Sequence, residues 1–384
     1  MEKLTKLIEQ LCPDGVEYKQ IGDVVEYEQP SKYLVKSTDY NDEYTTPVLT
    51  AGQTFILGYT NETDGIYQAS ADNPIIIFDD FTGAFKWVDF PFKAKSSAMK
   101  MLKAKGESIY LRYIFHVMGN IGYTSDEHKR LWIGIYSNIL IPVPPLEVQA
   151  EIVRILDTFT ELATELTTEL TNRKKQYEYY RDMLLKIDAP HYMLEEVCDI
   201  VDYRGKTPKK VDEGIFLVTA KNIRKGYIDY EKSQEYVDPN DYTEIMRRGL
   251  PKIGDVLITT EAPCGNVAQI DREDIALAQR VIKYRPKNEA LDSSYLKYVL
   301  LGEEFQRKLM SAATGGTVKG IKGSKLHKLT IPVPPIEEQQ RIVNILDRFD
   351  KLCNDISEGL PAEIESRQKQ YEYYRDKLLT FKAK

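Results

Sequence analysis

The stretch Ile141-Pro142-Val143-Pro144-Pro145-Leu146-Glu147-Val148-Gln149 decides the fold, because it returns 190 residues later as Ile331-Pro332-Val333-Pro334-Pro335-Ile336-Glu337-Glu338-Gln339. A second block, Gln176-Tyr177-Glu178-Tyr179-Tyr180-Arg181-Asp182, returns 194 residues later at 370–376, so the second copy carries four extra residues. This period is far longer than that of a solenoid. The chain therefore contains two copies of one large unit, each a variable globular part followed by a common helical part.

The common part begins with an extended segment and continues as a long helix. The prolines of the first block prevent a helix before them. We predict a helix over 147–185, which is 39 residues or roughly 58 Å at ~1.5 Å per residue, and we expect it to pair with the second copy over 337–379. The apolar residues recur at steps of mostly three and four, the pattern of a helix that packs along another helix; they are Ile152, Ile155, Phe159, Leu162, Leu166, Leu170, Tyr177, Tyr180 and Leu184.

The second helical copy contains one irregularity. Glu358-Gly359-Leu360-Pro361 lies where the four extra residues fall. Four added residues are a stutter in a coiled coil, and Gly-x-Pro breaks or kinks a helix. We therefore predict a helix that runs to about Ser357 and a second helix that starts near Pro361, with the pairing around this break left open.

The remaining sequence forms two variable heads, 1–140 and 188–330, and the helical regions are then 141–187 and 331–384. Short β-branched runs bounded by Gly, Pro, Asn and Asp predict mixed α+β heads of short strands and a few helices, one of them over 291–310. The heads are not obviously alike, yet weak echoes relate three pairs of stretches: 18–24 and 192–197, 47–53 and 216–222, and 73–78 and 254–259.

Composition bounds the possible functions. Hydrophobic residues make up 42% and charged residues 29%, an ordinary globular balance. The net charge of −7 counts against nucleic-acid binding, although DNA responds to the local field of the face that it meets. Neither a membrane span nor an export signal is recognisable. The cysteines have no CxxC spacing, which fits a reducing cytosol and argues against a zinc site or a disulfide framework; they are Cys12, Cys198, Cys264 and Cys353.

Over essentially the whole chain, the two I-P-V-P-P-[LI]-E-x-Q stretches and the QYEYYRD[MK]LL blocks make this sequence resemble the specificity (S) subunits of type I restriction–modification systems. The resemblance implies an α+β fold with an internal pseudo-two-fold repeat, in which two target-recognition domains are separated by two long antiparallel helices that form a coiled coil. Each head would read one half of a gapped site in double-stranded DNA. The chain itself would be non-catalytic and cytoplasmic.

The resemblance also implies the partners. Two methyltransferase (modification) subunits would dock on the helices, and restriction/translocase subunits would complete the complex. S-adenosylmethionine, Mg²⁺ and ATP are expected on those partner subunits, with no cofactor on this chain. The aromatic residues of the repeated block are the expected contacts to partners: Tyr177, Tyr180, Tyr371 and Tyr374.

Candidate DNA contacts are cations for phosphates and side chains with defined donors and acceptors for base edges. In the second head they come from a basic loop, a segment after a strand, a Gln-Arg pair and a Gly-rich basic segment: Tyr203, Arg204, Lys206, Thr207, Lys209, Lys221, Asn222, Arg224, Gln279, Arg280, Thr317, Lys319 and Lys322. The first head is more acidic and offers weaker candidates: Lys32, Lys36, Lys86, Lys93, Lys95 and Ser96. Each cluster could equally be a solvated surface loop.

Two other classes of function remain open. An enzyme is disfavoured because the sequence has neither a glycine-rich cofactor loop with a catalytic Asn/Asp-Pro-Pro-Tyr/Phe stretch nor a phosphate-binding G-x-x-x-x-G-K-[ST] loop. Asp79-Asp80 could bind a cation, but a turn or the polar lining of a DNA-binding face is the better interpretation. The four histidines have no paired spacing. A protein-binding coiled-coil adaptor is the second alternative, and the salt dependence of DNA affinity would distinguish it from a DNA reader.

Overall fold

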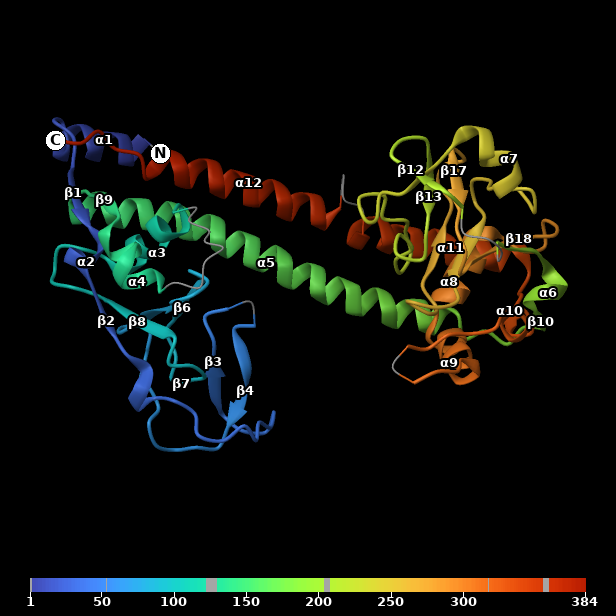
Figure 1. Ribbon diagram of the computed structural model, residues 1–384, viewed down its shortest axis with the longest axis horizontal. Helices are drawn as coiled ribbons and strands as arrows, with labels where there is room; N and C mark the ends of the chain where they lie inside the picture. The colour runs from blue at the N-terminus through green and yellow to red at the C-terminus, as the bar shows by residue number, and fades with distance from the viewer. Residues whose placement is uncertain (1, 53, 122–129, 204–207, 317, 355–358) are drawn as a thin grey trace. The chain divides into compact units, whose positions relative to one another are not determined.

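The computed structural model describes residues 2–52, 54–121, 130–203, 208–316, 318–354 and 359–384. The chain folds into two compact units: unit 1 consists of Met1–Leu166 with Ile364–Lys384, and unit 2 consists of Thr167–Glu363. Figure 1 shows the elements that belong to each unit. Each unit thus takes residues from both helical regions, whereas the sequence divides into four consecutive segments.

Unit 1 contains two small sheets and a strand pair. The four-stranded antiparallel sheet has the order β2 (Val25–Glu28), β8 (Met99–Ala104), β5 (Ile75–Asp79), β6 (Phe85–Val88). The three-stranded sheet has the order β4 (Ile56–Thr60), β3 (Thr46–Leu49), β7 (Lys93–Ala94), in which β3 and β7 are parallel. β1 (Glu17–Gln20) pairs with β9 (Leu140–Val143), and the short helices are α1 (Glu2–Leu11), α2 (Ile21–Val24), α3 (Leu111–Gly119) and α4 (Leu131–Gly134).

Unit 2 repeats this plan with different strand lengths. Its antiparallel sheet has the order β11 (Cys198–Asp202), β18 (Val281–Pro286), β15 (Val256–Thr259), β16 (Val267–Gln269). The second sheet has the order β12 (Lys210–Val211), β14 (Tyr236–Val237), β13 (Ile215–Val218), β17 (Ile275–Leu277), with β13 and β17 parallel. β10 (His191–Met193) pairs with β19 (Thr330–Pro332), and the short helices are α6 (Leu194–Val197), α7 (Tyr242–Ile245), α8 (Ser293–Leu301), α9 (Glu303–Ala312) and α10 (Gly323–Leu326).

The central strand of each antiparallel sheet feeds two cores. Side chains alternate between the faces of a strand. In β5, Ile76 and Phe78 join one buried cluster, while Ile75 and Ile77 join another. β15 does the same: Val256 and Ile258 join one cluster, and Leu257 joins the other. The three sequence echoes fall on equivalent elements, β1–α2 and β10–α6, β3 and β13, and β5 and β15. The two heads therefore share one fold.

The predicted helices are present with small changes. α5 spans Leu146–Leu184, one residue from the predicted bounds. α11 is described over Ile336–Asn354 and α12 over Leu360–Leu378, so the second helix starts as predicted, while the predicted end near Ser357 lies outside the described residues. The single helix expected over 291–310 is wrong: Gly302, in extended conformation, separates α8 from α9. A Cβ at Gly302 would lie 3.0 Å from Cδ1 of Leu185, the residue after α5, so a larger residue there would have to displace this side chain.

Within each unit the long helices pair antiparallel. In unit 1 the ring of Phe159 on α5 stacks on Tyr374 of α12, while Leu378, further along α12, shares a cluster with the earlier α5 residue Val148. In unit 2 the ring of Tyr180 stacks on Phe349 of α11. Between Phe159 and Gln176, all of which is described, α5 buries no side chain fully. The fully buried α5 side chains lie toward its two ends.

A buried glutamine fastens each head to the helix that follows it. The Oε1 atom of Gln149 accepts from Tyr110 N at 2.9 Å, and its Nε2 donates to Ser108 O at 3.1 Å and Pro144 O at 2.7 Å. Gln339 makes the same three contacts in unit 2, each at 2.8 Å. Both side chains are 0% exposed. The glutamine that ends the repeated Pro-rich stretch is thus a clamp, a role that the sequence analysis did not assign.

The repeated QYEYYRD block closes onto the opposite head. In unit 1, Arg375 donates to Gly119 O at the end of α3, at 2.8 Å. In unit 2, Asp182 accepts from Glu303 N at the start of α9, at 3.0 Å. The last residues of the chain then return to the first head, where Val16 N donates to Lys382 O at 2.9 Å. Each head is consequently supported by two helices: the helix that follows it in the sequence and part of the helix that follows the other head.

Candidate nucleic-acid interface

Four connections meet at one end of the sheets of unit 2. They are 219–226 after β13, 260–266 after β15, 278–280 between β17 and β18, and the described residues 313–316 and 318–322 before α10. Backbone bonds tie them together: Thr260 N donates to Arg280 O at 2.8 Å, and Ile321 N donates to Thr260 O at 2.9 Å. Asn266 Nδ2 donates to Ile223 O at 2.7 Å. The structure thus brings together three of the predicted DNA-contact segments: the segment after β13, the Gln279-Arg280 pair and the Gly-rich segment. The first and the last of these are more than 90 residues apart in the sequence.

The charged side chains of these connections are mainly cationic, and most of them are exposed. Lys221, Lys319 and Lys322 are exposed. Arg280 is 57% exposed and pairs with Glu261 at 2.8 Å, while Arg224 pairs with Asp229 at 3.3 Å. Gln279, half-buried, lies next to Arg280 in the β17–β18 connection. These residues stay predicted DNA contacts, and their common location strengthens the prediction.

One predicted contact residue has a structural role instead. Asn222 is 0% exposed. Its Oδ1 accepts from Thr219 N at 2.9 Å, and its Nδ2 donates to Asp229 O at 3.1 Å and to Lys232 O. The side chain therefore holds the turn after β13 and is out of reach of a duplex. The turn presents Lys221 in its place.

Tyr203 also lies mostly inside unit 2, where it braces the base of the basic loop that follows β11. Its hydroxyl donates to Gly249 O at 2.6 Å, and burial raises its pKa above the ordinary value. Arg204, Lys206 and Thr207 lie outside the described residues, as does Thr317 of the Gly-rich segment. Lys209, which follows them, is exposed.

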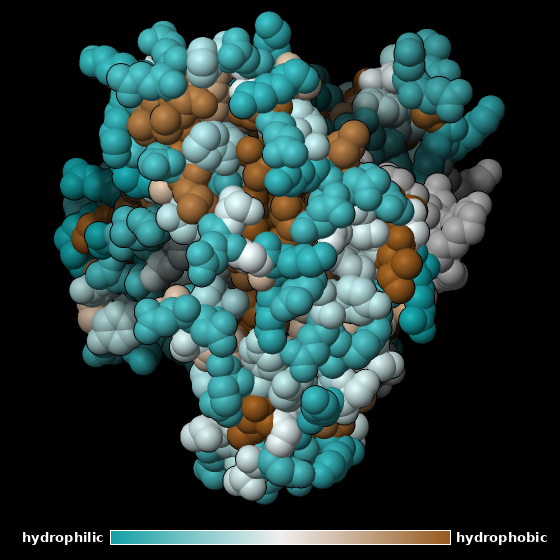
Figure 2. Space-filling view, turned by 90° about the vertical axis from the view of Figure 1, so that its left-hand side faces the viewer, coloured by the Kyte–Doolittle hydropathy of each residue, from teal (hydrophilic) through white to brown (hydrophobic). Residues whose placement is uncertain are grey.

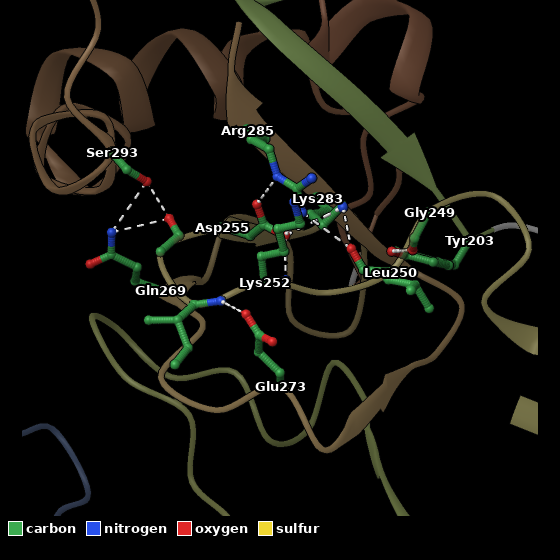
Figure 3. Close-up of polar contacts among 12 residues, drawn as sticks. Tyr203, Gly249, Leu250, Lys252, Asp255, Gln269, Glu273, Lys283, Arg285 and Ser293 are labelled. Carbon is green, nitrogen blue, oxygen red and sulfur yellow. Dashed lines mark hydrogen bonds and ion pairs between the residues drawn. The ribbon is translucent and has the colours of Figure 1, made fainter. Parts of the chain in front are cut away.

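Figure 3 shows what holds the turn on which Tyr203 rests. Asp255, 2% exposed, accepts from Arg285 at 2.6 and 2.7 Å and lies 3.3 Å from the ammonium group of Lys283. Lys283 also donates to Leu250 O at 2.9 Å. Burial lowers the pKa of Lys283 despite the attraction of Asp255, and the hydrogen bond to Asp255 raises the pKa of Arg285. This polar cluster fixes the 249–252 turn against β18.

Two of the predicted cations of the first head, Lys93 and Lys36, are paired with acidic groups. Lys93 is 1% exposed, pairs with Glu62 at 2.9 Å and donates to Asp64 O at 2.7 Å, so its burial removes it from the side chains that a duplex could reach. Lys36 is exposed but pairs with Asp64 at 2.8 Å. Both cations belong to one acid–base network, in which Lys36 follows η1 (Pro30–Lys32), Lys93 lies on β7, and the two acids follow β4.

The other candidates of the first head are scattered. Lys32 is exposed, Lys86 on β6 is half-buried, and Ser96 is exposed. Lys95 donates to the hydroxyl of Tyr40 at 3.1 Å and lies over its ring. Lys95 and Ser96 lie in the connection between β7 and β8, which corresponds to the β17–β18 connection of unit 2. Their assignment as DNA contacts stays a prediction.

Asp79 and Asp80 form a turn, as the sequence interpretation favoured. The carboxylate of Asp79 accepts from Phe81 N at 3.0 Å and Thr82 N at 2.8 Å. Asp80 is 1% exposed, accepts from Trp132 N at 2.8 Å and lies 3.2 Å from Lys100 Nζ. Among the described residues, no group of three or more His, Cys, Asp and Glu side chains is arranged to hold a metal ion. In the described ranges, no helix is long and apolar enough to cross a membrane.

The four tyrosines expected to contact partners lie on the inner side of the long helices, where Tyr180 and Tyr374 face the paired helix and Tyr371 faces α3. Tyr177 is 7% exposed, and Tyr180 stacks on Phe349. Tyr371 lies against His116, and Tyr374 stacks on Phe159. The outward tyrosines of the same block are Tyr179, 65% exposed, and Tyr373, 60% exposed. The helical stripe already places Tyr177 and Tyr180 on the inner face, so this phase could have identified the outer pair from the sequence.

An apolar groove lies elsewhere in unit 1. It has a volume of about 480 Å³ and is lined by Trp87, Tyr110, Leu111 and Val153, with Arg112 stacked over the ring of Trp87 at 4.8 Å. Figure 2 shows apolar side chains gathered between hydrophilic ones on one face of the molecule.

Two heads of one fold, with unlike loops at the same end and a duplicated helical support, define a two-headed recognition protein. Residues 13–175 and 191–366 match the family model of the type I restriction modification DNA specificity domain, and the chain belongs to this family. The resemblance noted in the sequence is confirmed.

Similar proteins span nearly the whole chain. The chain is 43% identical over 405 residues to the specificity subunit of the type I restriction enzymes EcoR124I/EcoR124II of Escherichia coli, covering 99% of this chain and 97% of that protein. It is 32% identical to a putative type I restriction enzyme specificity subunit of Haemophilus influenzae, covering 86% of each. The fold is similar to that of an S subunit from M. genitalium, with a TM-score of 0.57 at 14% identity over 96% of this chain and 97% of that one.

Proposed function

We propose that each head reads one half of a bipartite, gapped site in double-stranded DNA, and that partner subunits methylate adenine and restrict the DNA. The observation that carries this proposal is the repeat: one fold occurs twice, and the loops at its equivalent ends differ in length and charge. The described loops of unit 2 carry exposed Lys221, Lys319 and Lys322, whereas the equivalent described loops of unit 1 carry Lys95 and the buried Asp80. Two heads with unlike loops would read unlike half-sites, which makes the whole site asymmetric.

The methylation pattern in cells tests this proposal. The chain is co-expressed with its cognate methyltransferase subunit, and methylated bases are mapped by long-read sequencing. We expect a gapped two-part motif with one methylated adenine on each strand. Four residues inserted into α5 near Leu166 should change the gap and leave both half-sites alone. A short continuous motif, or no motif from an assembled complex, would contradict the proposal and favour a protein-binding adaptor.

DNA binding by the loops of unit 2 has a separate test. Binding to phosphates releases counterions, so the logarithm of the affinity falls with the logarithm of the salt concentration, by about 0.9 for each phosphate neutralised. Lys319→Ala and Lys322→Ala should each reduce this slope by about 1 and weaken binding to all sequences alike. An adaptor would show a slope near zero, and neither substitution would change it.

The partners are proposed to be two methyltransferase subunits that dock on the outer faces of the helices. Tyr179 and Tyr373 are related by the repeat and both are exposed, so two copies of one partner can bind through the same surface, one at each tyrosine. Exposed aromatic side chains are frequent anchors of protein interfaces. Tyr179→Ala and Tyr373→Ala should each leave one partner bound per chain, and the double variant none, as measured by native mass spectrometry. Tyr192→Ala, which is 41% exposed outside these helices, is the control.

Catalysis and its cofactors are proposed to belong to the partners. S-adenosylmethionine would bind the methyltransferase subunits, and Mg²⁺ and ATP the restriction/translocase subunits, all in the cytoplasm. The absence of the corresponding sequence motifs from this chain supports the assignment. Transfer of labelled methyl groups to DNA should require the partner subunit and should be undetectable with the purified chain alone. Transfer by the chain alone would overturn this part of the proposal.

A further inference from the structure

One arginine in the interface of unit 2 has a backbone conformation that L-residues rarely adopt. Arg280 has a φ of +70° in the connection between β17 and β18. Its carbonyl oxygen accepts from both Thr260 N at 2.8 Å and Thr260 Oγ1 at 3.2 Å, so β15 holds this conformation. Residues kept in the left-handed region by their surroundings concentrate at functional sites. The side chain of Arg280 is nevertheless 57% exposed, so burial of this side chain does not explain the unusual backbone conformation.

Glu261 holds the guanidinium of Arg280. Its Oε1 lies 2.8 Å from Arg280 Nε. On the other side, Glu261 forms a backbone bridge with Gly320, and a Cβ added at Gly320 would lie 3.3 Å from the Cβ of Glu261. Glu261 therefore stands between Arg280 and the cationic segment that contains Lys319. Because Glu261 Oε1 lies against Nε and the arginine side chain is more than half exposed, the Nη groups at the end of the guanidinium remain accessible to another ligand.

The first head has no such pair at the equivalent place. Asp80 N donates to Ala98 O at 3.1 Å, as Thr260 N does to Arg280 O, and Leu131 N donates to Asp80 O at 2.8 Å, as Ile321 N does to Thr260 O. These bonds align Ala98 with Arg280, and Phe81 with Glu261. Phe81 is 40% exposed. The charged pair is thus a feature of the second head and can contribute only to the half-site which that head reads.

We propose that Arg280 reads a guanine of the second head's half-site through hydrogen bonds to its N7 and O6 atoms in the major groove, and that Glu261 is the positioning residue that holds the guanidinium for this contact. Guanine is the base whose major-groove edge offers two acceptors to the arginine fork. Because it names a base contact for the reading head, this inference rests on the proposed function.

The first test compares methylation motifs of complexes that carry Arg280→Ala, Arg280→Lys or Glu261→Gln. We expect one G·C position in one half-site to become degenerate in Arg280→Ala, with a loss of discrimination on the order of 10-fold. Arg280→Lys should relax the same position, because an ammonium group does not have the planar, bidentate donor geometry of a guanidinium. Glu261→Gln should relax that position more weakly. The half-site of the first head should stay unchanged in every variant and reports that the complex has assembled.

A matched control is available at the opposite end of the sheet. Arg272 forms an exposed ion pair with Asp274 at 2.8 Å, the same distance as in the Arg280–Glu261 pair, and Arg272→Ala should leave the motif unchanged. If Arg280→Ala fails to fold, Arg280→Gly provides the same loss of side chain with a residue that accepts a positive φ.

The second test changes the DNA atom. Duplexes carrying the mapped motif are made with 7-deazaguanine, which lacks N7, at the identified position, and single-turnover methylation is measured. The wild-type complex should slow by about 10-fold, whereas the Arg280→Ala complex should be insensitive to the change. An unchanged half-site in Arg280→Ala, equal sensitivity of both complexes to 7-deazaguanine, or a Glu261→Gln effect at another position would overturn the inference. A wild-type complex without a bipartite motif would instead overturn the proposed function.

Discussion

The hydrogen bonds of the buried glutamine clamp let us predict how much the stability of each unit depends on this one side chain. Gln149→Met keeps the length and volume of the side chain but removes all three of its hydrogen bonds, at 2.7, 2.9 and 3.1 Å. The substitution leaves one backbone N–H and two carbonyl groups without their partner; the carbonyl of Pro144 is buried, and the other two groups are partly buried. Each such group costs about 1–3 kcal/mol, and allowing for partial rescue by water we expect a loss of about 3 kcal/mol in the free energy of unfolding of unit 1.

The chain provides a probe that reports unit 1 alone. Its two tryptophans, Trp87 and Trp132, both belong to that unit. With a urea m-value of about 2–3 kcal/mol/M, the midpoint observed by tryptophan fluorescence should fall by roughly 1–1.5 M. Gln10→Met, at an exposed position of α1, should shift it by less than ~0.2 M. Equal midpoints for Gln149→Met and Gln10→Met would refute the clamp.

Three further changes test other contacts of unit 1. Burial lowers the pKa of His116 in the folded protein, so the neutral histidine contributes stability above about pH 6.5 that is lost as the pH falls below it. In unit 2 the equivalent position holds Tyr298, which bonds Asp347 as His116 bonds Asp157. His116→Tyr should therefore flatten the dependence of the urea midpoint between pH 7.5 and 5.5, and a persisting slope would contradict this. Lys93→Met should cost about 3 kcal/mol because it leaves Glu62 unpaired, while Lys36→Met at an exposed pair should cost under ~0.5 kcal/mol, and neither should alter the salt slope of DNA binding. Deleting 381–384 removes the bonds from Tyr18 to Phe381 O and from Val16 to Lys382 O, both 2.9 Å, and should lower the tryptophan-detected stability by about 2 kcal/mol; no change in the midpoint would show that this tail is dispensable.

The long helices were predictable because their signals are local. The apolar stripe set the bounds of α5 to within one residue, and Gly359 with Pro361 marked the start of α12. The exchange of supports between the units was not predictable in the same way. It depends on contacts such as Arg375 with Gly119, which are 256 residues apart and follow from no pattern within either stretch.

The DNA-contact residues show the limit of reading charge from sequence. Lys93 and Lys319 are the same residue type in basic stretches, yet one is buried against Glu62 and the other is exposed. The difference arises because Lys93 pairs with Glu62, which lies 31 residues earlier in the chain, and the residue type alone does not reveal this partner. Arg280 and Glu261 illustrate the reverse case, because the arginine was a candidate but its partner became visible only when β15 and β18 were paired.

The chemistry of the clamp explains how unlike heads can share one support. Apart from the glutamine itself, every group in the contact is main-chain: Ser108 O, Tyr110 N and Pro144 O in unit 1, with the same kinds of group in unit 2. A head sequence can therefore change freely, provided that its chain still forms the turn before the α3 or α8 helix. Where a side chain of the head does take part, the helix tolerates a change of residue, since Asp157 pairs with His116 and its counterpart Asp347 with Tyr298. The proposed reading loops, such as 260–266, lie at the strand ends, in a different part of the head from this contact. A change in the bases that such a loop reads therefore need not alter the support on which the head rests.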